Sequence, residues 1–366
     1  MAVEFVGMIR TADSSEIHPP SGPSVDRDYL RRFAQAHEEA GFDRVLIGYH
    51  SWDADGFSVA GYAAAHTERL GFLLAHRPGF VAPTLAARKL ATLDQLIGGR
   101  LAVHVISGAS ETEQRRDGDY SDKPARYRRT DEYLDVVRRI WDSGEPIDHE
   151  GEFYRFAGAR SEVKPVDGAL PIYFGGSSSD AYRVGGKHAD VFALWGEPLA
   201  ETAEQIAAVR GAAAAQGRDP GELGFSVSFR PIIGRTDEEA WERAHGILNT
   251  ITARSSGSPG AMLAFPSAER GAGSQRLLDA ADKGDRHDRA LWTAPAKATG
   301  AAGNSTALVG SPETVARALL DYVDIGVTTL LIRGYDPLED VVDWGRHLLP
   351  LVRQELAHRS RPAHAG

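Results

Sequence analysis

The segment from Leu73 to Gly108, LLAHRPGFVAPTLAARKLATLDQLIGGRLAVHVISG, decides the fold class of this chain. An apolar run ends at Ala75-His76-Arg77, apolar residues recur at helical spacing over 84–97, and a second apolar run begins at Leu101. Two glycines separate the helical part from the second run, as expected where a helix stops. Two strands joined by one helix predict a parallel βαβ unit.

The same alternation of strand and helix continues on both sides of this segment. We predict strands over 3–9, 44–49, 71–77, 101–106, 171–176, 191–195, 223–233 and 327–333. We predict helices over 26–40, 58–68, 84–97, 126–142, 178–187, 200–216, 237–248, 312–324 and 338–356. This order predicts a closed (β/α)8 TIM barrel. An open doubly wound sheet is the alternative, but no GxGxxG sequence follows a strand.

We interpret residues 1–366 as one domain with two insertions and a tail at 357–366. The smaller insertion, 145–168, is polar and contains a predicted hairpin around Phe153-Tyr154-Arg155-Phe156. The larger, 250–305, is rich in Gly, Ser, Ala and charge, and reads as a long structureless stretch. Such stretches often act as lids, so we predict a mobile lid here; a surface insertion without a role is the alternative.

The composition restricts the class of protein. The chain has no cysteine, which excludes disulfides, thiolate metal sites and cysteine nucleophiles. Its net charge of −10 argues against a nucleic-acid partner. No apolar run approaches the roughly 20 residues that span a bilayer, and the N-terminus has no signal-peptide pattern. We therefore expect no membrane association and a cytoplasmic location.

The sequence suggests an anion site where the predicted strand 171–176 meets a helix. Gly175 and Gly176 would let the backbone approach a ligand closely, and Ser177 and Ser178 would offer donors beside a helix N-terminus, as for a cofactor phosphate. Tyr127, at the start of a basic helix, could also reach a phosphate. The alternatives are an ordinary capped βα turn and a packing role for the tyrosine.

Polar and aromatic residues occur within or at the ends of other predicted strands. The candidates are His50, His76, His104, Trp195, Arg230 and Arg333. Three histidines could hold a metal, but no HxH or HExxH spacing accompanies them, so we predict no metal site and instead hydrogen bonds to a flat heterocycle. The arginines suit an oxyanion such as a sulfonate or carboxylate, with a structural salt bridge as the alternative. The tryptophan could wall a pocket or belong to the core.

Several segments together resemble the bacterial luciferase-like flavin-dependent monooxygenases, above all their alkanesulfonate monooxygenase branch. The matching segments are LLAHRPGFVAPTLAARKLATLDQLIGGRL (73–101), PIYFGGSSSDA (171–181), ALWGEPLAETAEQIAAVR (193–210), STALVGSPETVA (305–316) and LLIRGYDPLED (330–340). The resemblance implies a TIM barrel that takes reduced FMN (FMNH2) from a separate NAD(P)H:flavin reductase and uses O2. In the sulfonate branch the products are an aldehyde and sulfite. The resemblance also implies a homodimer or homotetramer.

The resemblance assigns roles to individual residues. Gly175, Gly176, Ser177, Ser178 and Tyr127 would hold the FMN phosphate, and Met8, Ala75, His76, His104, Ser107 and Trp195 would contact the rest of the flavin. We expect His50 and Tyr335 beside the reacting oxygen, and Arg230 and Arg333 against an anionic substrate.

The chain departs from the sulfonate branch at three places. Ser228-Phe229-Arg230 replaces an Arg-x-His pair, Asp53 replaces a cysteine, and the lid arginine has no counterpart near 297–303. Two other functions therefore stay open: a deazaflavin (F420)-dependent dehydrogenase on the same barrel, and a flavin-binding protein without catalysis.

Overall fold

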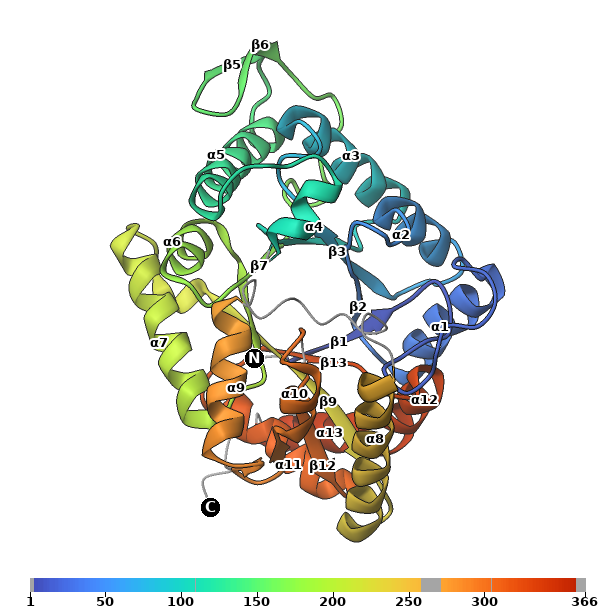
Figure 1. The fold of residues 1–366 in the computed structure, drawn as a ribbon. Coiled ribbons are helices and arrows are strands. Elements are labelled where there is room, and N and C mark those ends of the chain that lie inside the picture. Colours follow the sequence, from blue (N-terminus) through green and yellow to red (C-terminus); the bar gives the residue numbers. More distant parts are fainter. Residues whose placement is uncertain (1–2, 109, 258–270, 304, 360–366) are drawn as a thin grey trace, which may run out of the picture.

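Eight parallel strands form a closed ring, which confirms the predicted TIM barrel (Figure 1). The computed structural model describes residues 3–108, 110–257, 271–303 and 305–359. In ring order the strands are β1 (Glu4–Ile9), β2 (Arg44–Ile47), β3 (Gly71–His76), β4 (Leu101–Val105), β7 (Ile172–Gly175), β8 (Val191–Trp195), β9 (Gly224–Ile233) and β13 (Thr329–Ile332). The pairing of β8 with β9 and of β13 with β1 closes the ring.

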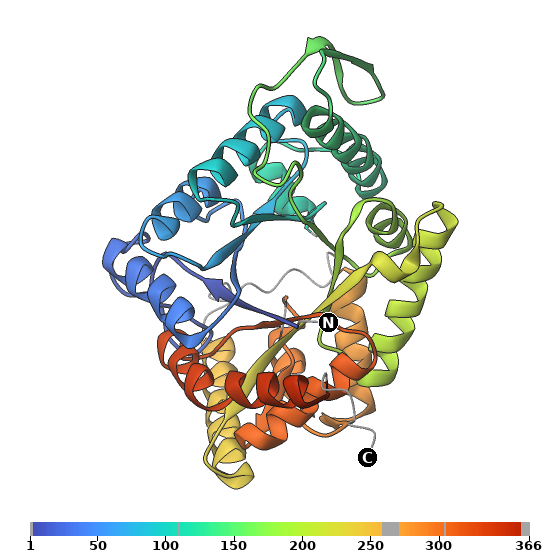
Figure 2. The ribbon, with the colours of Figure 1, turned by 180° about the vertical axis from the view of Figure 1, so that it is seen from behind.

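Helices surround the ring on all sides, as both views show (Figures 1 and 2). They are α1 (Arg27–Ala40), α2 (Gly56–Ala64), α3 (Pro83–Leu96), α5 (Lys123–Asp142), α6 (Ser179–His188), α7 (Leu199–Ala215), α8 (Asp237–Gly257), α11 (Pro312–Asp324), α12 (Pro337–His347) and α13 (Leu349–Arg359). A 3-10 turn, Pro220–Glu222, leads into β9. No helix in the described part of the chain is long and apolar enough to cross a membrane.

Local sequence signals set many of the helix ends. The carboxylate of Asp26 accepts hydrogen bonds from the amides of Asp28 and Tyr29 and so caps the start of α1. The same helix ends at Gly41, whose φ of +85° suits glycine. Such caps explain why many of the predicted helix boundaries lie within a few residues of the observed ones, although α8 ends at Gly257 and not at the predicted 248.

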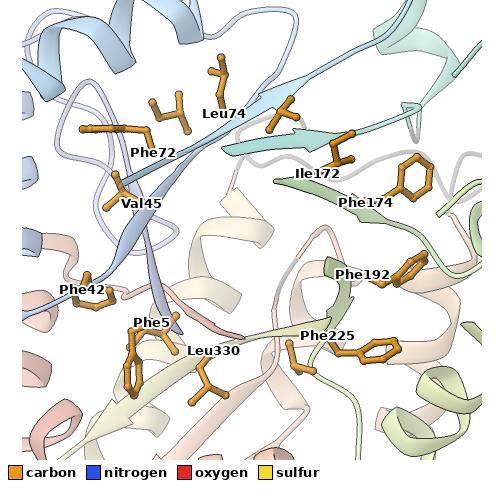
Figure 3. Packing of buried hydrophobic residues seen from close by; sticks show 14 of the residues in the cluster. Phe5, Phe42, Val45, Phe72, Leu74, Ile172, Phe174, Phe192, Phe225 and Leu330 are labelled. Atoms are coloured by element: carbon orange, nitrogen blue, oxygen red, sulfur yellow. The ribbon is translucent and has the colours of Figure 1, made fainter. Parts of the chain in front are cut away.

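The main core lies between the ring and the helices. Alternate strand residues point outward, and Figure 3 shows Phe72 and Leu74 of β3 and Phe192 of β8 on this outer side. The residues between them point inward and form a separate cluster inside the barrel: Val6, Leu73, Ala102, Tyr173 and Leu331. Within this cluster, Tyr173 donates a hydrogen bond of 2.8 Å to Glu4, the first residue of β1. Side chains therefore fill the barrel interior toward the amino ends of the strands. The space for a ligand lies at the carboxyl ends of the strands, here called the upper end or mouth of the barrel.

Two additions interrupt the alternation of strand and helix. A hairpin of β5 (Ile147–Glu150) and β6 (Arg155–Ala159) lies outside α5, within the predicted insertion 145–168. A short helix, α4 (Glu111–Arg116), follows β4 and was not predicted from the sequence. It begins at Ser110, whose hydroxyl accepts a hydrogen bond from the Glu113 amide.

The prediction that 250–305 is structureless is wrong for most of the segment. It contains the end of α8, then α9 (Ala272–Lys283), β10 (Arg286–His287), β11 (Leu291–Trp292) and α10 (Ala294–Thr299), and β12 (Ala307–Gly310) follows it. The helical spacing of Leu277, Ala280 and Ala281, all buried, explains α9; the glycine and serine content concealed it. Residues 258–270 lie outside the described residues, and so does the tail from 360 onward.

The predicted closing helix 338–356 is two helices rather than one. The helical path is interrupted at Leu348, between α12 and α13. Pro350 has no amide hydrogen to donate to the preceding turn, which is the physical reason for the interruption.

We predict that Phe192→Ala lowers the free energy of unfolding by about 3 to 5 kcal/mol, because a large ring is removed from a close-packed core. Phe192 is fully buried, and its ring lies so close to Gly185 that a Cβ there would come within 2.3 Å of it. The measurement is urea unfolding followed by circular dichroism. Leu96→Ala is the control, because this side chain is 80% exposed and should change stability by less than about 0.5 kcal/mol. Equal losses in both variants would contradict the core assignment.

Candidate active site

At the upper end of the barrel, the inward-facing residues at the carboxyl ends of the strands lie close together. On β4 and β7 these are His104 and Gly175, on adjacent strands. A Cβ on Gly175 would lie 3.6 Å from the His104 ring nitrogen Nε2, so the glycine leaves space beside the imidazole. Burial lowers the pKa of His104 to about 4, and its Nδ1 has no hydrogen-bond partner in the described structure. The ring is therefore neutral, and its Nε2 faces the space that Gly175 leaves open.

The predicted phosphate turn brings most of its residues together. Gly176 has a φ of +143°, and a Cβ there would lie 3.3 Å from the Tyr127 hydroxyl oxygen. Ser178 caps α6 by accepting from the Ala181 amide, and its hydroxyl lies 3.4 Å from that of Tyr127. Two hydroxyls and a helix N-terminus thus surround a space that only glycine leaves open. Burial raises the pKa of Tyr127, so the phenol keeps its proton.

The first turn of α9 covers this turn from the other side. A Cβ on Gly273 would lie 3.2 Å from the Trp195 ring and 3.5 Å from the Ser177 hydroxyl oxygen. Part of the segment 250–305 therefore lies against the predicted cofactor residues. Trp195 is only partly buried and packs against a small cluster of Leu277, Ala296 and Ala301.

Two predicted cofactor residues, His76 and Ser107, contact side chains of helix α5. His76 is the outward-facing residue at the end of β3, where its Nε2 lies 2.6 Å from the Tyr133 hydroxyl on α5. Burial lowers the pKa of His76 to about 4. Strand alternation explains this placement, because its neighbour Ala75 is on the inner face. The Ser107 hydroxyl lies 3.2 Å from that of Thr130, also on α5.

The two predicted anion-binding arginines already share an internal carboxylate. Arg230 reaches Glu16 at 2.7 Å and donates to the Gly334 carbonyl at 2.7 Å, and Arg333 donates to the same carboxylate. Burial alone would raise the pKa of Glu16, but the two guanidinium groups hold it well below its usual value. Burial, and then the charge of Arg230, lower the pKa of Arg333 to about 10. The structure thus contains the salt bridge that the sequence left as the alternative.

Tyr335 is buried beneath this cluster. Its ring centroid lies 3.6 Å from the guanidinium carbon of Arg230, and burial raises its pKa. It belongs to a second core between α8, β9 and β12. The tyrosine therefore supports the arginine from below instead of lining the open cavity.

His50 lies at the mouth of the barrel beside a buried carboxylate. Its Nδ1 is 3.5 Å from Glu113 Oε1, and its ring stacks on Trp52 with centroids 4.9 Å apart. Glu113 also accepts from Arg77 at 2.7 Å and from the Ser51 amide at 3.1 Å. Burial by itself raises the pKa of Glu113, but the contacts with His50 and Arg77 lower it to about 2. This arrangement keeps a charged carboxylate next to the histidine.

A cavity of about 230 Å³ opens between β1, β2 and β13. Its lining includes Met8 and His50 from the predicted set, together with Arg230 and Arg333. In ring order β1 lies four strands from β7, so this cavity and the phosphate turn are on opposite sides of the mouth.

Glu16, Glu113, Arg10 and Arg254 also belong to this mouth, and the sequence analysis missed them. Glu16 lies in a loop, and Glu113 lies on the unpredicted helix α4. Arg10 follows the last residue of β1. A polar residue at a strand end is the signal that identified His76, so the sequence carried the same signal for Arg10. For the other three we find no local signal, because their partners are distant in sequence.

The predicted histidines do not form a metal site in the described structure. The one group of possible metal ligands found there is Asp131 and Asp135 on α5 with the buried His188 at the end of α6. Lys187 bridges the two aspartates at 2.7 Å each, and Arg183 contacts Asp131 at 2.6 Å. Protein cations therefore already neutralise these carboxylates.

Residues 3–329 match the family described as luciferase-like monooxygenase, and the chain belongs to this family. The match covers most of the barrel, including the phosphate turn and β8. The family and its fold are thus established, as the sequence resemblance implied, whereas the alkanesulfonate branch is not specifically shown.

Solved structures with the same fold include three at 19 to 22% identity. Riboflavin lyase RcaE, solved with modified FMN and riboflavin, is 22% identical with a TM-score of 0.80, covering 97% of this chain and 92% of its own. DmoA from Hyphomicrobium sulfonivorans is 21% identical with a TM-score of 0.76, covering 100% and 89%. EDTA monooxygenase EmoA from Chelativorans sp. BNC1 is 19% identical with a TM-score of 0.78, covering 97% and 94%. At these identities the likeness supports the fold.

We predict that His76→Gln reduces the loss of stability between pH 7.5 and pH 5. The folded-state pKa of His76 is about 4, against 6.5 in the unfolded chain, so between these values only the unfolded chain binds the proton. Protonation therefore costs wild type about 2 kcal/mol of stability by pH 5 at this residue, and the variant should lack this loss. The measurement is urea unfolding across this pH range.

The matched control for this experiment is His358→Gln, because His358 is exposed on α13. Its pH dependence should follow wild type. If His76→Gln also followed wild type, the buried, neutral state of His76 would be wrong.

Proposed function

We propose that this chain is a two-component monooxygenase that uses FMNH2 and O2 and acts on a small anionic substrate, with an organosulfonate as the leading class. A separate NAD(P)H:flavin reductase would supply the reduced flavin. The observation that carries the proposal is the phosphate turn at Gly175–Ser178 facing, across the barrel mouth, a cavity rich in arginine. Membership of the luciferase-like monooxygenase family supports it.

The residues at the mouth fit FMN. The space beside Gly176, bounded by Tyr127, Ser178 and the start of α6, suits a phosphate, because hydroxyl and amide donors meet where a side chain would otherwise lie. The neutral His104, whose Nε2 would lie 3.6 Å from a Cβ on Gly175, offers a hydrogen bond to a flat heterocycle. Small residues on the inner face, such as Ala75, leave room for the ring system.

When bound, reduced FMN would supply two electrons for the activation of O2. The protein would bind the substrate anion, exclude water and hold protons at defined atoms. His50 is placed for the last role, since it lines the cavity and its Nδ1 lies 3.5 Å from the Glu113 carboxylate. For a sulfonate RCH2SO3⁻, the balanced outcome with FMNH2 and O2 is RCHO, sulfite, FMN, water and one proton.

The charge of the cavity supports an anionic substrate. Four arginines line it, Arg10, Arg230, Arg254 and Arg333, against two carboxylates, Glu16 and Asp53. A positive pocket favours sulfonates or carboxylates over neutral compounds.

A deazaflavin-dependent dehydrogenase is the second candidate. An F420-dependent secondary alcohol dehydrogenase is also structurally similar, with a TM-score of 0.70 at 17% identity, covering 96% of this chain and all of its own. Such an enzyme would transfer hydride and ignore O2. A flavin-binding protein without catalysis is a third reading, and it would bind FMN without turnover. For assembly and location we propose a homodimer or homotetramer in the cytoplasm, to be tested by analytical ultracentrifugation and cell fractionation.

Anaerobic fluorescence titration with FMNH2, oxidised FMN and reduced F420 separates these candidates. We expect the protein to bind FMNH2 most tightly, and to release sulfite from 1-pentanesulfonate when a flavin reductase and O2 are added. Preference for F420 would move the enzyme to hydride transfer. Binding of FMNH2 with no oxidation of any sulfonate or carboxylate would favour the non-catalytic reading.

We predict that Tyr127→Phe and Ser178→Ala each weaken FMN binding about tenfold and leave riboflavin binding unchanged, because only FMN carries the phosphate. The measurement is fluorescence titration of each variant with both ligands. Ser311→Ala is the matched control, since Ser311 caps α11 in the same way at a site remote from the turn. If FMN and riboflavin weakened equally, the phosphate would not be bound at this turn.

A further inference from the structure

The arginines of the cavity fall into two classes. Arg230 and Arg333 share the carboxylate of Glu16, and Arg230 is 2% exposed. Their charge is thus partly neutralised, and their outer nitrogens are occupied by Glu16, the Gly334 carbonyl and the Met8 sulfur.

Glu16 is held in place by several contacts along its loop. Arg254 donates to its backbone carbonyl at 2.8 Å. The preceding Ser15 accepts from the amides of Ile17 and His18 at 3.2 and 3.1 Å, and the ring of His18 lies 2.5 Å from Asp336. A carboxylate fixed on both sides acts as a permanent counter-ion rather than a group that a ligand displaces.

Arg10 and Arg254 form the other class. Within the described residues neither makes an ion pair: Arg10 contacts the Ser14 hydroxyl at 3.4 Å, and Arg254 contacts the neutral Glu16 carbonyl. Both line the cavity, one from the end of β1 and the other from α8. Their charges are therefore available to a ligand, whereas those of Arg230 and Arg333 are already balanced in part.

We propose that Arg10 and Arg254 bind the sulfonate or carboxylate group of the substrate, while Glu16 is a fixed counter-ion that limits how tightly anions bind. Met8 and Trp52 also line the cavity and offer contact for an apolar tail. This inference deepens the proposed function, on which its substrate role rests, and it differs from the sequence-based expectation that Arg230 and Arg333 bind the anion.

The test is isothermal titration calorimetry with 1-pentanesulfonate, hexanoate and the neutral hexanamide, with and without saturating FMN. We expect wild type to bind at least one anion about tenfold more tightly than hexanamide. Arg10→Gln and Arg254→Gln should each weaken anion binding about tenfold and leave hexanamide unchanged. The sulfonate and carboxylate arms show which oxyanion the site prefers.

Arg235→Gln is the matched control, because it removes the same charge from a surface side chain that is 88% exposed. It should bind both anions as wild type does. Wild-type anion affinity in Arg10→Gln and Arg254→Gln, or equal affinity of wild type for anions and hexanamide, would overturn the proposal.

Glu16→Gln gives a change of opposite sign. Removing the counter-ion adds a positive charge to the cavity, so anion affinity should rise about tenfold if the variant folds, as checked by circular dichroism. Unchanged or weaker anion binding in the folded variant would overturn the counter-ion role. If Glu16→Gln does not fold, Glu16→Asp is the second variant. It keeps the negative charge and should bind anions as wild type does. A large change in the anion affinity of Glu16→Asp would overturn the counter-ion role of Glu16.

These titrations do not require turnover, so the two proposals can fail separately. Arginine-dependent anion binding without FMNH2 binding would remove the monooxygenase proposal and retain the anion site. FMNH2-dependent turnover of a substrate, with wild-type anion affinity in both arginine variants, would remove the anion site and retain the monooxygenase proposal.

Discussion

Closure of eight parallel strands into one ring is the constraint on which the rest of this structure depends. In a closed ring each strand has only two faces, so alternate residues point to the outer core or to the interior. This alternation sends Leu73 inward and Leu74 outward, and it separates Ala75 from His76 at the strand end. The lower interior is filled by side chains, so every inward-facing polar residue at the upper end becomes part of a potential ligand site.

The upper end has two parts with different physical chemistry. On the β7 side, glycines, hydroxyls and a helix N-terminus offer neutral donors around open space. On the β1 and β13 side charged groups dominate, and the buried Arg230 and Arg333 pair with Glu16, which offsets the cost of their burial. Glu16, which lies 214 positions earlier in the chain, supplies the counter-charge that offsets the cost of burying Arg230. Under the proposed function, this separation would place the cofactor phosphate and the substrate anion at different sites, so that the two would not compete.

Much of the fold follows from local pattern. The strand–helix unit at 73–108 and its repetition predicted the barrel, and caps such as Asp26 and Gly41 explain why many helix ends were placed correctly. The errors have local causes as well. Small residues concealed α9 between apparent loop segments, and Pro350 divides a helix whose apolar spacing looked continuous. The candidate site was predicted less fully, because its decisive pairs join Glu16, Glu113 and arginines that are far apart in sequence.

By itself, the sequence determined the barrel, the family resemblance and the glycine–serine turn at 175–178 that leads into α6, because each depends on residues close together in the chain. Only the tertiary structure decided which polar residues act together. It directed His76 toward α5 and buried Tyr335 beneath Arg230. It also paired Arg230 and Arg333 with Glu16 and left Arg10 and Arg254 without an ion pair in the described residues. The physical reason is that the charge available at a site depends on distances between side chains, which chain folding sets and local spacing does not record.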